Sequence, residues 1–224
     1  MESVLAYIGF MERAGNDPSQ RDLLQASQTT DALSIVCQRY GQCHLRDGTE
    51  VRIRLVEPDD ALASSAMLGA CSPKSLYSRY ERVVTEEPDE LATRLCCPDF
   101  QTELVVVAEI TVNAASSIIG VAQLLADPSH ETAEYAVLVA DPWQRKGLGS
   151  AFTDYCLQLA YSWGVRRVVA EFLPNNVRII RILDKRGFDL YCNMQEHVVS
   201  GQKIIRTSTH RTRRSATHYP GTDG

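Results

Sequence analysis

The sequence predicts a mixed α/β fold, with one sheet of about six or seven strands flanked by about four helices. Two apolar patterns lead to this prediction. Residues 51–55 alternate apolar and charged side chains, which is the period of a half-buried strand. Leu148, Phe152, Tyr155 and Leu159 are spaced like one face of an amphipathic helix. Because strand and helix patterns follow one another along the chain, we expect at least one right-handed strand–helix–strand crossover.

The first elements are expected after a turn at Asp47–Gly48, where the pattern becomes clear. A strand follows this turn directly. Pro58 begins a helix. Ser72 and Pro73 have the residue types of an N-cap and a first helical position, so a second helix is expected to begin there. Residues 86–99 contain two prolines, and we expect a loop or a short helix.

The later elements complete the sheet. They are, in order, strands at 104–110, 118–125 and 132–140, a helix at 148–163, a strand at 167–173, a helix at 175–185 and a closing hairpin at 188–207. The strand at 132–140 is apolar on both faces near its end, which is typical of a central strand. Gly164 and Gly187 stand where the last two helices are expected to end.

The composition suits one packed domain with tails. The chain has 224 residues, of which 44% are hydrophobic and 23% charged, so global disorder is not expected. The longest uninterrupted apolar run, residues 135–140, is far shorter than the roughly 18 residues of a membrane helix. The N-terminus opens with an acid and lacks a basic region, so we expect no signal peptide, no membrane association and a cytoplasmic location.

Charge and cysteine usage argue against two kinds of partner. The net charge is −5, and the segment from residue 200 onward is basic, so the rest of the chain is acidic and no nucleic-acid partner is expected. The seven cysteines lack a CxxC pair and the histidines are scattered, so no metal site is expected. Cys156 lies beside the apolar stripe of a helix, which favours packing over a covalent role.

The chain divides into three parts by pattern. Residues 1–47 form an extension of unknown role, with short helical patterns but too few residues to bury a core alone. Residues 48–208 contain the regular strand and helix patterns. Residues 209–224 form a basic tail, which we expect to be poorly ordered.

The stretch Gln144–Ser150 (QRKGLGS) lies between a buried strand and the start of a helix. The first N–H groups of a helix have no intrahelical partner, and the helix dipole adds about half a positive charge there. Gly147 and Gly149 remove the Cβ atoms that would keep an anion from the backbone, and Arg145 and Lys146 add mobile positive charge. The pattern predicts a cradle for a diphosphate, although a tight strand-to-helix connection would use the same residues. It matches neither a Walker loop nor a dinucleotide fingerprint.

In its context, this stretch resembles the GNAT superfamily of acyl-CoA-dependent N-acetyltransferases. The strand, loop and helix of that family are similar to AEYAVLVADPWQRKGLGSAFTDYCLQLA, and its later Asn, helix and Gly-Phe are similar to NNVRIIRILDKRGF. The resemblance covers about residues 47–208 and implies a mostly antiparallel sheet. LRDGTEVRIRLVEPDDA and SPKSLYSRYERV further resemble the bacterial protein-lysine acetyltransferase branch.

The resemblance implies acetyl-CoA as the co-substrate, bound without a metal. The diphosphate would lie on the backbone N–H groups of Gln144–Ser150. The pantetheine arm would pair with exposed backbone groups of the strand before this loop, and Asn176 would hold the arm from the other side. The implied cofactor-binding residues are Val137, Leu138, Val139, Gln144, Arg145, Lys146, Gly147, Leu148, Gly149, Ser150 and Asn176.

The implied chemistry is direct attack of an amine on the thioester carbonyl in a ternary complex. A free lysine has a pKa of about 10.4, so a base is needed at neutral pH. Glu134 is the candidate general base, because it lies early in the central strand and matches the position of the glutamate in related acetyltransferases; an ion-pair role would also suit it. Glu109 and Glu171 are alternatives on neighbouring strands. A backbone N–H of Val137 or Leu138 would stabilise the oxyanion.

Three functions stay open at this level. The first is acetylation of the Nε of a protein lysine, the second is acetylation of a small amine, and the third is a non-catalytic acyl-CoA-binding sensor. The third is open because many GNAT enzymes have a tyrosine seven residues after the motif Asn, which acts as general acid toward the leaving thiolate. This chain has Leu183 at that position. Tyr135 and Tyr191 are the substitutes that the sequence offers. The acceptor groove is expected from residues 59–98 and the hairpin at 188–208, and the oligomeric state is not indicated.

Overall fold

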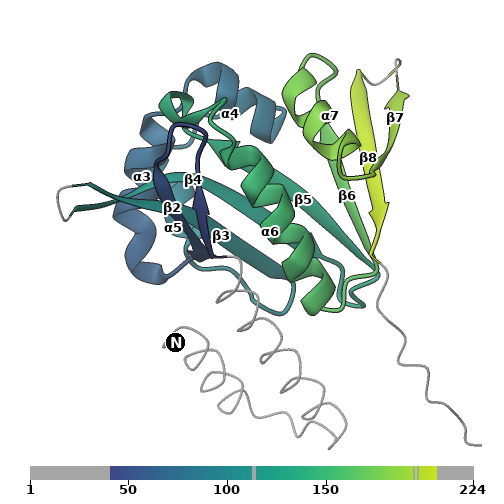
Figure 1. Cartoon of the computed structure of the whole chain (residues 1–224), viewed down its shortest axis with the longest axis horizontal. Coiled ribbons are helices and arrows are strands. Elements are labelled where there is room, and N and C mark those ends of the chain that lie inside the picture. The colour runs from purple at the N-terminus through teal and green to yellow at the C-terminus, as the bar shows by residue number, and fades with distance from the viewer. Residues whose placement is uncertain (1–40, 113–114, 194, 196, 206–224) are drawn as a thin grey trace, which may run out of the picture.

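The computed structural model describes residues 41–112, 115–193, 195 and 197–205, and these form one open sheet covered by helices. The sheet has eight strands in the order β1-β2-β3-β4-β5-β6-β8-β7, and every neighbouring pair is antiparallel except β5 and β6 (Figure 1). The strands are β1 (Gln42–His44), β2 (Glu50–Leu55), β3 (Glu103–Val112), β4 (Ala115–Ala126), β5 (Thr132–Val139), β6 (Arg167–Phe172), β7 (Asp189–Asn193) and β8 (Val198–Ile204).

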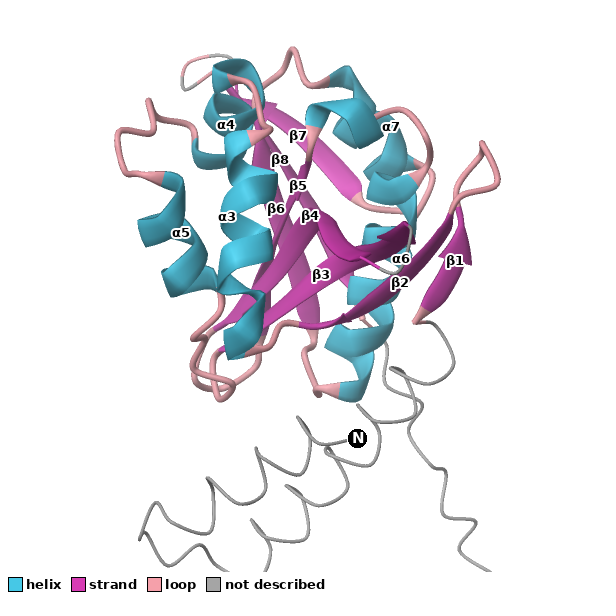
Figure 2. Ribbon diagram, turned by 90° about the vertical axis from the view of Figure 1, so that its left-hand side faces the viewer, coloured by secondary structure: helices cyan, strands magenta, loops and turns pink. Residues whose placement is uncertain are grey.

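Five α-helices and two short 3₁₀ helices lie within the same described part of the chain. They are η1 (Pro58–Asp60), α3 (Ala61–Gly69), α4 (Pro73–Tyr80), α5 (Pro88–Leu95), η2 (Asp141–Trp143), α6 (Leu148–Ser162) and α7 (Val177–Asp184). Figure 2 shows α3 and α5 on one side of the sheet and α6 on the other. None of these helices has the length and apolar character needed to span a membrane.

The predicted fold class is confirmed, and two elements exceed the expected counts. β1 has only three residues, which is too short for an alternating pattern to be visible in the sequence. α5 lies in the proline-containing segment 86–99, where Pro88 occupies the first turn and so begins a helix instead of preventing one. The N-cap prediction at Ser72 is confirmed, since its side chain accepts a hydrogen bond from the N–H of Ser75.

The domain division stays a prediction. Residues 1–40 and 206–224, which include most of the predicted extension and the whole basic tail, lie outside the described residues. The described sheet begins before residue 48, because β1 pairs with β2 from Gln42 onward.

Two apolar cores lie on opposite faces of the sheet. α6 covers one face with Leu148, Phe152, Tyr155 and Leu159, the predicted stripe, and each of these side chains is at most 2% exposed. The other core packs side chains of α3 and α5 against the opposite face of β3 and β4. Because the middle of β3 and β4 is covered on both faces, residues 104–108 and 118–122 hold no polar side chain. Cys156 is buried in the α6 core, as expected for a packing residue, and burial raises the pKa of its thiol.

The parallel pair β5 and β6 stays together for only three residues. The pairing joins Thr132 to Arg167, Ala133 to Val168 and Glu134 to Val169, and then it stops. β5 continues antiparallel to β4 as far as Val139, while β6 continues beside β8. The two strands therefore diverge, and the sheet opens in its middle between α6 on one side and α7 on the other (Figure 1).

We predict that the close approach of α6 to the sheet fails if Gly120 on β4 gains a side chain. A Cβ there would lie 2.9 Å from the carbonyl oxygen of Leu138 and 3.0 Å from a ring carbon of Phe152. We expect Gly120→Ala to lower the free energy of unfolding by about 2 kcal/mol through overpacking. Urea denaturation measures this loss. Gly69→Ala is the control, because a Cβ at Gly69 has no neighbour within 4 Å; equal stability of the two variants would contradict the prediction.

Candidate active site

The loop between β5 and α6 presents a row of unbonded backbone N–H groups. Gly147, the residue before α6, has φ of +105°, a left-handed conformation that favours glycine. Among the described residues, no acceptor is found for the backbone N–H groups of residues 145–149. The N–H groups of Gln144 and Ser150, which the sequence analysis included, donate instead to the carbonyl oxygens of Asp141 and Gly147. The loop therefore offers N–H donors at a helix N-terminus, where an anion is favoured.

The two basic residues of this loop differ in their surroundings. The Nζ of Lys146 lies 3.0 Å from a carboxylate oxygen of Asp47 and 4.4 Å from the ring centroid of Trp143. Lys146 is therefore held against the turn between β1 and β2, and it is not the mobile charge that the sequence suggested. Arg145 is exposed. Asp47 keeps its charge at low pH, because its hydrogen bonds with Thr49 and Lys146 lower its pKa to about 2.

Alternate residues of β5 turn their backbone groups toward the gap. Ala140 donates its N–H to Ile119 of β4, and Leu138 is paired with Val121 in the same register. Since N–H and C=O groups alternate in direction along a strand, Leu138 faces β4, while Val137 and Val139 face the gap. Of the three residues proposed to bind the pantetheine arm, the geometry thus provides backbone groups from two.

The Gln144 side chain links the elements around this gap. Its Nε2 donates to the carbonyl oxygen of Val139 at 3.1 Å and to the hydroxyl of Ser75 at 2.9 Å. Its Oε1 accepts a hydrogen bond from Arg178 of α7 at 3.1 Å. α4, β5 and α7 therefore meet at one side chain at the mouth of the gap.

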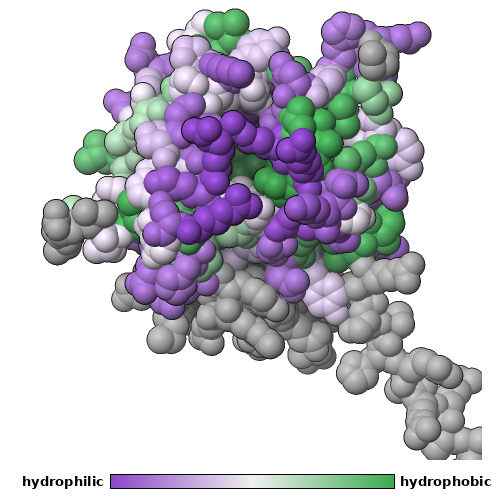
Figure 3. All heavy atoms as spheres, turned by 45° about the horizontal axis from the view of Figure 1, so that its top comes forward, coloured by the Kyte–Doolittle hydropathy of each residue, from purple (hydrophilic) through white to green (hydrophobic). Residues whose placement is uncertain are grey.

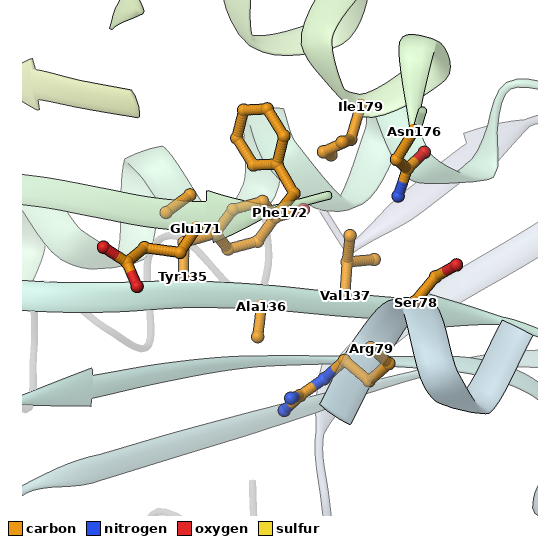
Figure 4. A pocket seen from close by; sticks show the side chains of 10 residues that line it. Ser78, Arg79, Tyr135, Ala136, Val137, Glu171, Phe172, Asn176 and Ile179 are labelled. Atoms are coloured by element: carbon orange, nitrogen blue, oxygen red, sulfur yellow. The ribbon is translucent and has the colours of Figure 1, made fainter. Parts of the chain in front are cut away.

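A pocket of about 50 Å³ occupies the opening between β5 and β6. α4 closes one side and α7 the other, and Figure 4 shows Asn176 and Ile179 across the opening from Val137. Asn176, a predicted binding residue, is the N-cap of α7 and lines this pocket. The whole lining is Ser78, Arg79, Tyr135, Ala136, Val137, Ala170, Glu171, Phe172, Asn176 and Ile179. On the face that Figure 3 brings forward, hydrophilic side chains surround a hollow with hydrophobic side chains at its base.

Three carboxylates from neighbouring segments lie near this pocket. Glu134 is exposed on β5, next to the point where β5 and β6 separate, and Glu171 is on β6. Glu81 follows α4 in a left-handed conformation with φ of 53°. Burial first, and then the charges of Glu171 and Glu134, raise the pKa of Glu81. The arrangement is suited to a cationic group, which would relieve this repulsion.

Arg79 supplies the opposite charge on the α4 side. Its Nη2 donates to Oε1 of Gln123 on β4, and Gln123 donates in turn to Glu103 at 2.6 Å. Burial lowers the pKa of Arg79, and the nearby charges of Glu134 and Glu103 oppose that effect. Figure 4 shows its guanidinium beneath Ala136. Arg79 lies in α4 and Glu81 directly follows it. The sequence signals predicted this helix but gave neither residue a role, so sequence analysis missed both.

Glu109 and Leu183, which the sequence analysis singled out, both lie away from the pocket lining. Glu109, an alternative base, accepts hydrogen bonds from Arg54 at 2.9 Å and from Ser116, and it does not line the pocket. Arg54 also bonds Asp60, so Glu109 belongs to an ion-pair network that joins η1 to β2 and β3. Leu183, at the position where many GNAT enzymes have a tyrosine, is fully buried in the α6 core.

The histidines and cysteines do not gather into a metal site in the part of the chain that the structure describes. No group of three or more His, Cys, Asp or Glu side chains there has the geometry to hold a metal ion. Both ring nitrogens of His130 are hydrogen-bonded to backbone oxygens, at 3.0 Å each, which indicates a structural role.

The chain belongs to the acetyltransferase (GNAT) family, whose model matches residues 74–188. It is a GNAT acetyltransferase. Its structure is similar to the GNAT domain of PAT from S. lividans, with 25% identity and a TM-score of 0.64 over 73% of this chain and 95% of that one.

Two further solved structures have the same fold. One is yncA of Salmonella typhimurium, solved with its cofactor acetyl-CoA, with 20% identity and a TM-score of 0.58 over 70% of this chain and 94% of that one. The other is spermidine N-acetyltransferase from Vibrio cholerae, in complex with CoA and spermine. It has 16% identity and a TM-score of 0.57 over 69% of this chain and 95% of that one.

The hydroxyl of Tyr135 is tied to the core, and we predict a structural role for it. It lies 3.0 Å from Oγ1 of Thr153 on α6, and burial raises its pKa well above the usual value. Tyr135→Phe should lower the free energy of unfolding by about 1 kcal/mol, the value of one buried hydrogen bond. Chemical denaturation measures the change, with Tyr191→Phe as the control because Tyr191 is exposed on β7. A loss for the control of the same size would refute this assignment.

Proposed function

We propose that this protein transfers an acetyl group from acetyl-CoA to an amine, and that the acceptor is the Nε of a lysine on a protein. The observation that carries the proposal is the gap between β5 and β6, with unbonded N–H groups at one end and carboxylates at the other. The first end suits the phosphates of acetyl-CoA, and the second suits a cationic amine.

The residues of this chain fit acetyl-CoA at three places. The N–H groups of residues 145–149 face a position where a diphosphate would be favoured. The edge of β5 offers the backbone groups of Val137 to an extended arm, as a further strand would use them. Asn176 lines the opposite side of the pocket with an amide group. When bound, acetyl-CoA supplies the reactive thioester.

The chain must first remove a proton from the amine. Neutralising a lysine of pKa 10.4 at pH 7 costs about 4.6 kcal/mol, so a base or a desolvating site is needed. Glu134 is our candidate for the base, because it lies where β5 and β6 separate and Glu171 and Glu81 draw a cation to the same place. The N–H of Val137, which faces the gap, would donate to the oxygen that gains negative charge.

The sequence supports a protein acceptor. Residues 45–61 (LRDGTEVRIRLVEPDDA) and residues 72–83 (SPKSLYSRYERV) resemble the protein-lysine acetyltransferase branch.

Incubation with acetyl-CoA and a cell lysate tests the proposal directly. Mass spectrometry would read which lysines or metabolites gain an acetyl group. Acetyl-lysine on proteins would support the proposal, and acetylation confined to small amines would favour the second function. Binding of acetyl-CoA with no transfer to any acceptor would favour the sensor.

We predict that Glu134→Gln slows acetyl transfer by a factor of about 10² to 10⁴, the usual contribution of a general base. Binding of acetyl-CoA, measured by titration calorimetry, should change little, because the N–H groups of the loop are untouched. Glu171→Gln is the matched variant on the neighbouring strand. If Glu171→Gln slows acetyl transfer by this factor and Glu134→Gln stays active, the base is Glu171.

We predict that the negative charge of Glu81 lowers the stability of the fold and favours binding of the cationic acceptor. Its pKa is raised above the ordinary 4.5, so the folded state is penalised at pH values above that pKa, and the penalty disappears as the carboxylate protonates. Glu81→Gln should therefore unfold at a higher temperature than the parent at pH 7 but not at pH 3.5, and its KM for a lysine peptide should rise. Glu50→Gln, on β2, should leave KM unchanged; a fall in melting temperature for Glu81→Gln at pH 7 would contradict the repulsion.

A further inference from the structure

The turn between β1 and β2 packs against the loop that precedes α6. The backbone N–H of Arg46 donates to the carbonyl oxygen of Lys146 at 2.9 Å, and Asp47 holds the ammonium of Lys146 at 3.0 Å. Figure 1 shows this turn, in purple, beside the start of α6 and on the opposite side of that start from α7. These contacts fix the backbone from which the Arg46 side chain extends.

The Arg46 side chain runs over the glycine of the loop. A Cβ built on Gly147 would lie 3.7 Å from Cγ and 4.0 Å from Nε of Arg46. Within residues 41–112, 115–193, 195 and 197–205, its guanidinium has neither an ion pair nor a hydrogen bond. Lys146, by contrast, is already paired with Asp47. Arg46 therefore brings an uncommitted positive charge to the unbonded N–H groups of residues 145–149.

We propose that Arg46 binds the 3′-phosphate of the adenosine of acyl-CoA. The inference rests on the proposed function, in which the diphosphate lies on the loop and the pantetheine arm runs into the gap toward Asn176. The adenosine would then leave the diphosphate in another direction, and the turn that carries Arg46 lies on the side of the α6 start away from α7. A guanidinium can form two parallel hydrogen bonds with a phosphate dianion, which suits this role.

Titration calorimetry with CoA and with dephospho-CoA, which lacks only the 3′-phosphate, tests this assignment. We expect Arg46→Ala to weaken CoA binding about tenfold, the effect of one charge-assisted hydrogen bond, and to leave dephospho-CoA binding unchanged. Arg46→Lys should recover part of the loss. The control is Arg166→Ala, which removes an exposed charge paired with Glu131 before β6 and should bind both ligands like the parent.

The other outcomes overturn the inference in distinguishable ways. If Arg46→Ala weakens both ligands equally, its partner is the diphosphate, and the 3′-phosphate assignment is wrong. If the variant binds both ligands like the parent, Arg46 contacts no phosphate, although the proposed function stands. If the parent protein binds neither ligand, the proposed function fails and this inference fails with it. Circular dichroism of each variant establishes that it is folded.

Discussion

The candidate active site of this protein depends on the point at which two neighbouring strands, β5 and β6, stop pairing. β5 and β6 are the only parallel pair in the described sheet, and their pairing ends at Glu134 and Val169. Beyond that point β5 has a partner on one edge alone, so the backbone groups of Val137 have no strand to satisfy them. An unpaired edge inside a protein is costly unless something else pairs with it. The loop before α6 follows β5 directly, so the free strand edge and the N–H groups at the helix N-terminus lie near one opening.

Much of the fold was predictable because its signals are local. The stripe of α6 extends over residues 148–159, and the N-cap at Ser72 is a single-residue signal, so both were predicted correctly from the sequence. β1 was not predicted, because three residues carry no period. The exposed backbone groups of the strand at 132–140 were implied only by the family resemblance. Nothing in the alternation of Ala136 or Val137 marks the residue at which pairing ends, since that depends on how α4 and α7 pack.

The candidate site was predictable to a similar degree. The glycine-containing loop has a physical reason for its residue types, and the structure puts those residues at the start of α6. The partners of the charged residues were not predictable, because they come from distant segments. Lys146 was expected to be a free cation, yet it is paired with Asp47 across a turn that lies far away in the sequence. Arg79 lies in α4 and Glu81 directly follows it, and only the packing of that helix on the sheet brings them near Glu134.

The side-chain amide of Gln144 affects which backbone groups of β5 a ligand can use. Its Nε2 occupies the carbonyl of Val139, the last acceptor on the free edge of β5, so the protein already fills one place that an incoming chain would use. A ligand that pairs with this carbonyl oxygen would compete with the amide for it. Because the same amide also bonds Ser75 of α4 and Arg178 of α7, the acceptor at the end of β5 is linked through one side chain to both helices.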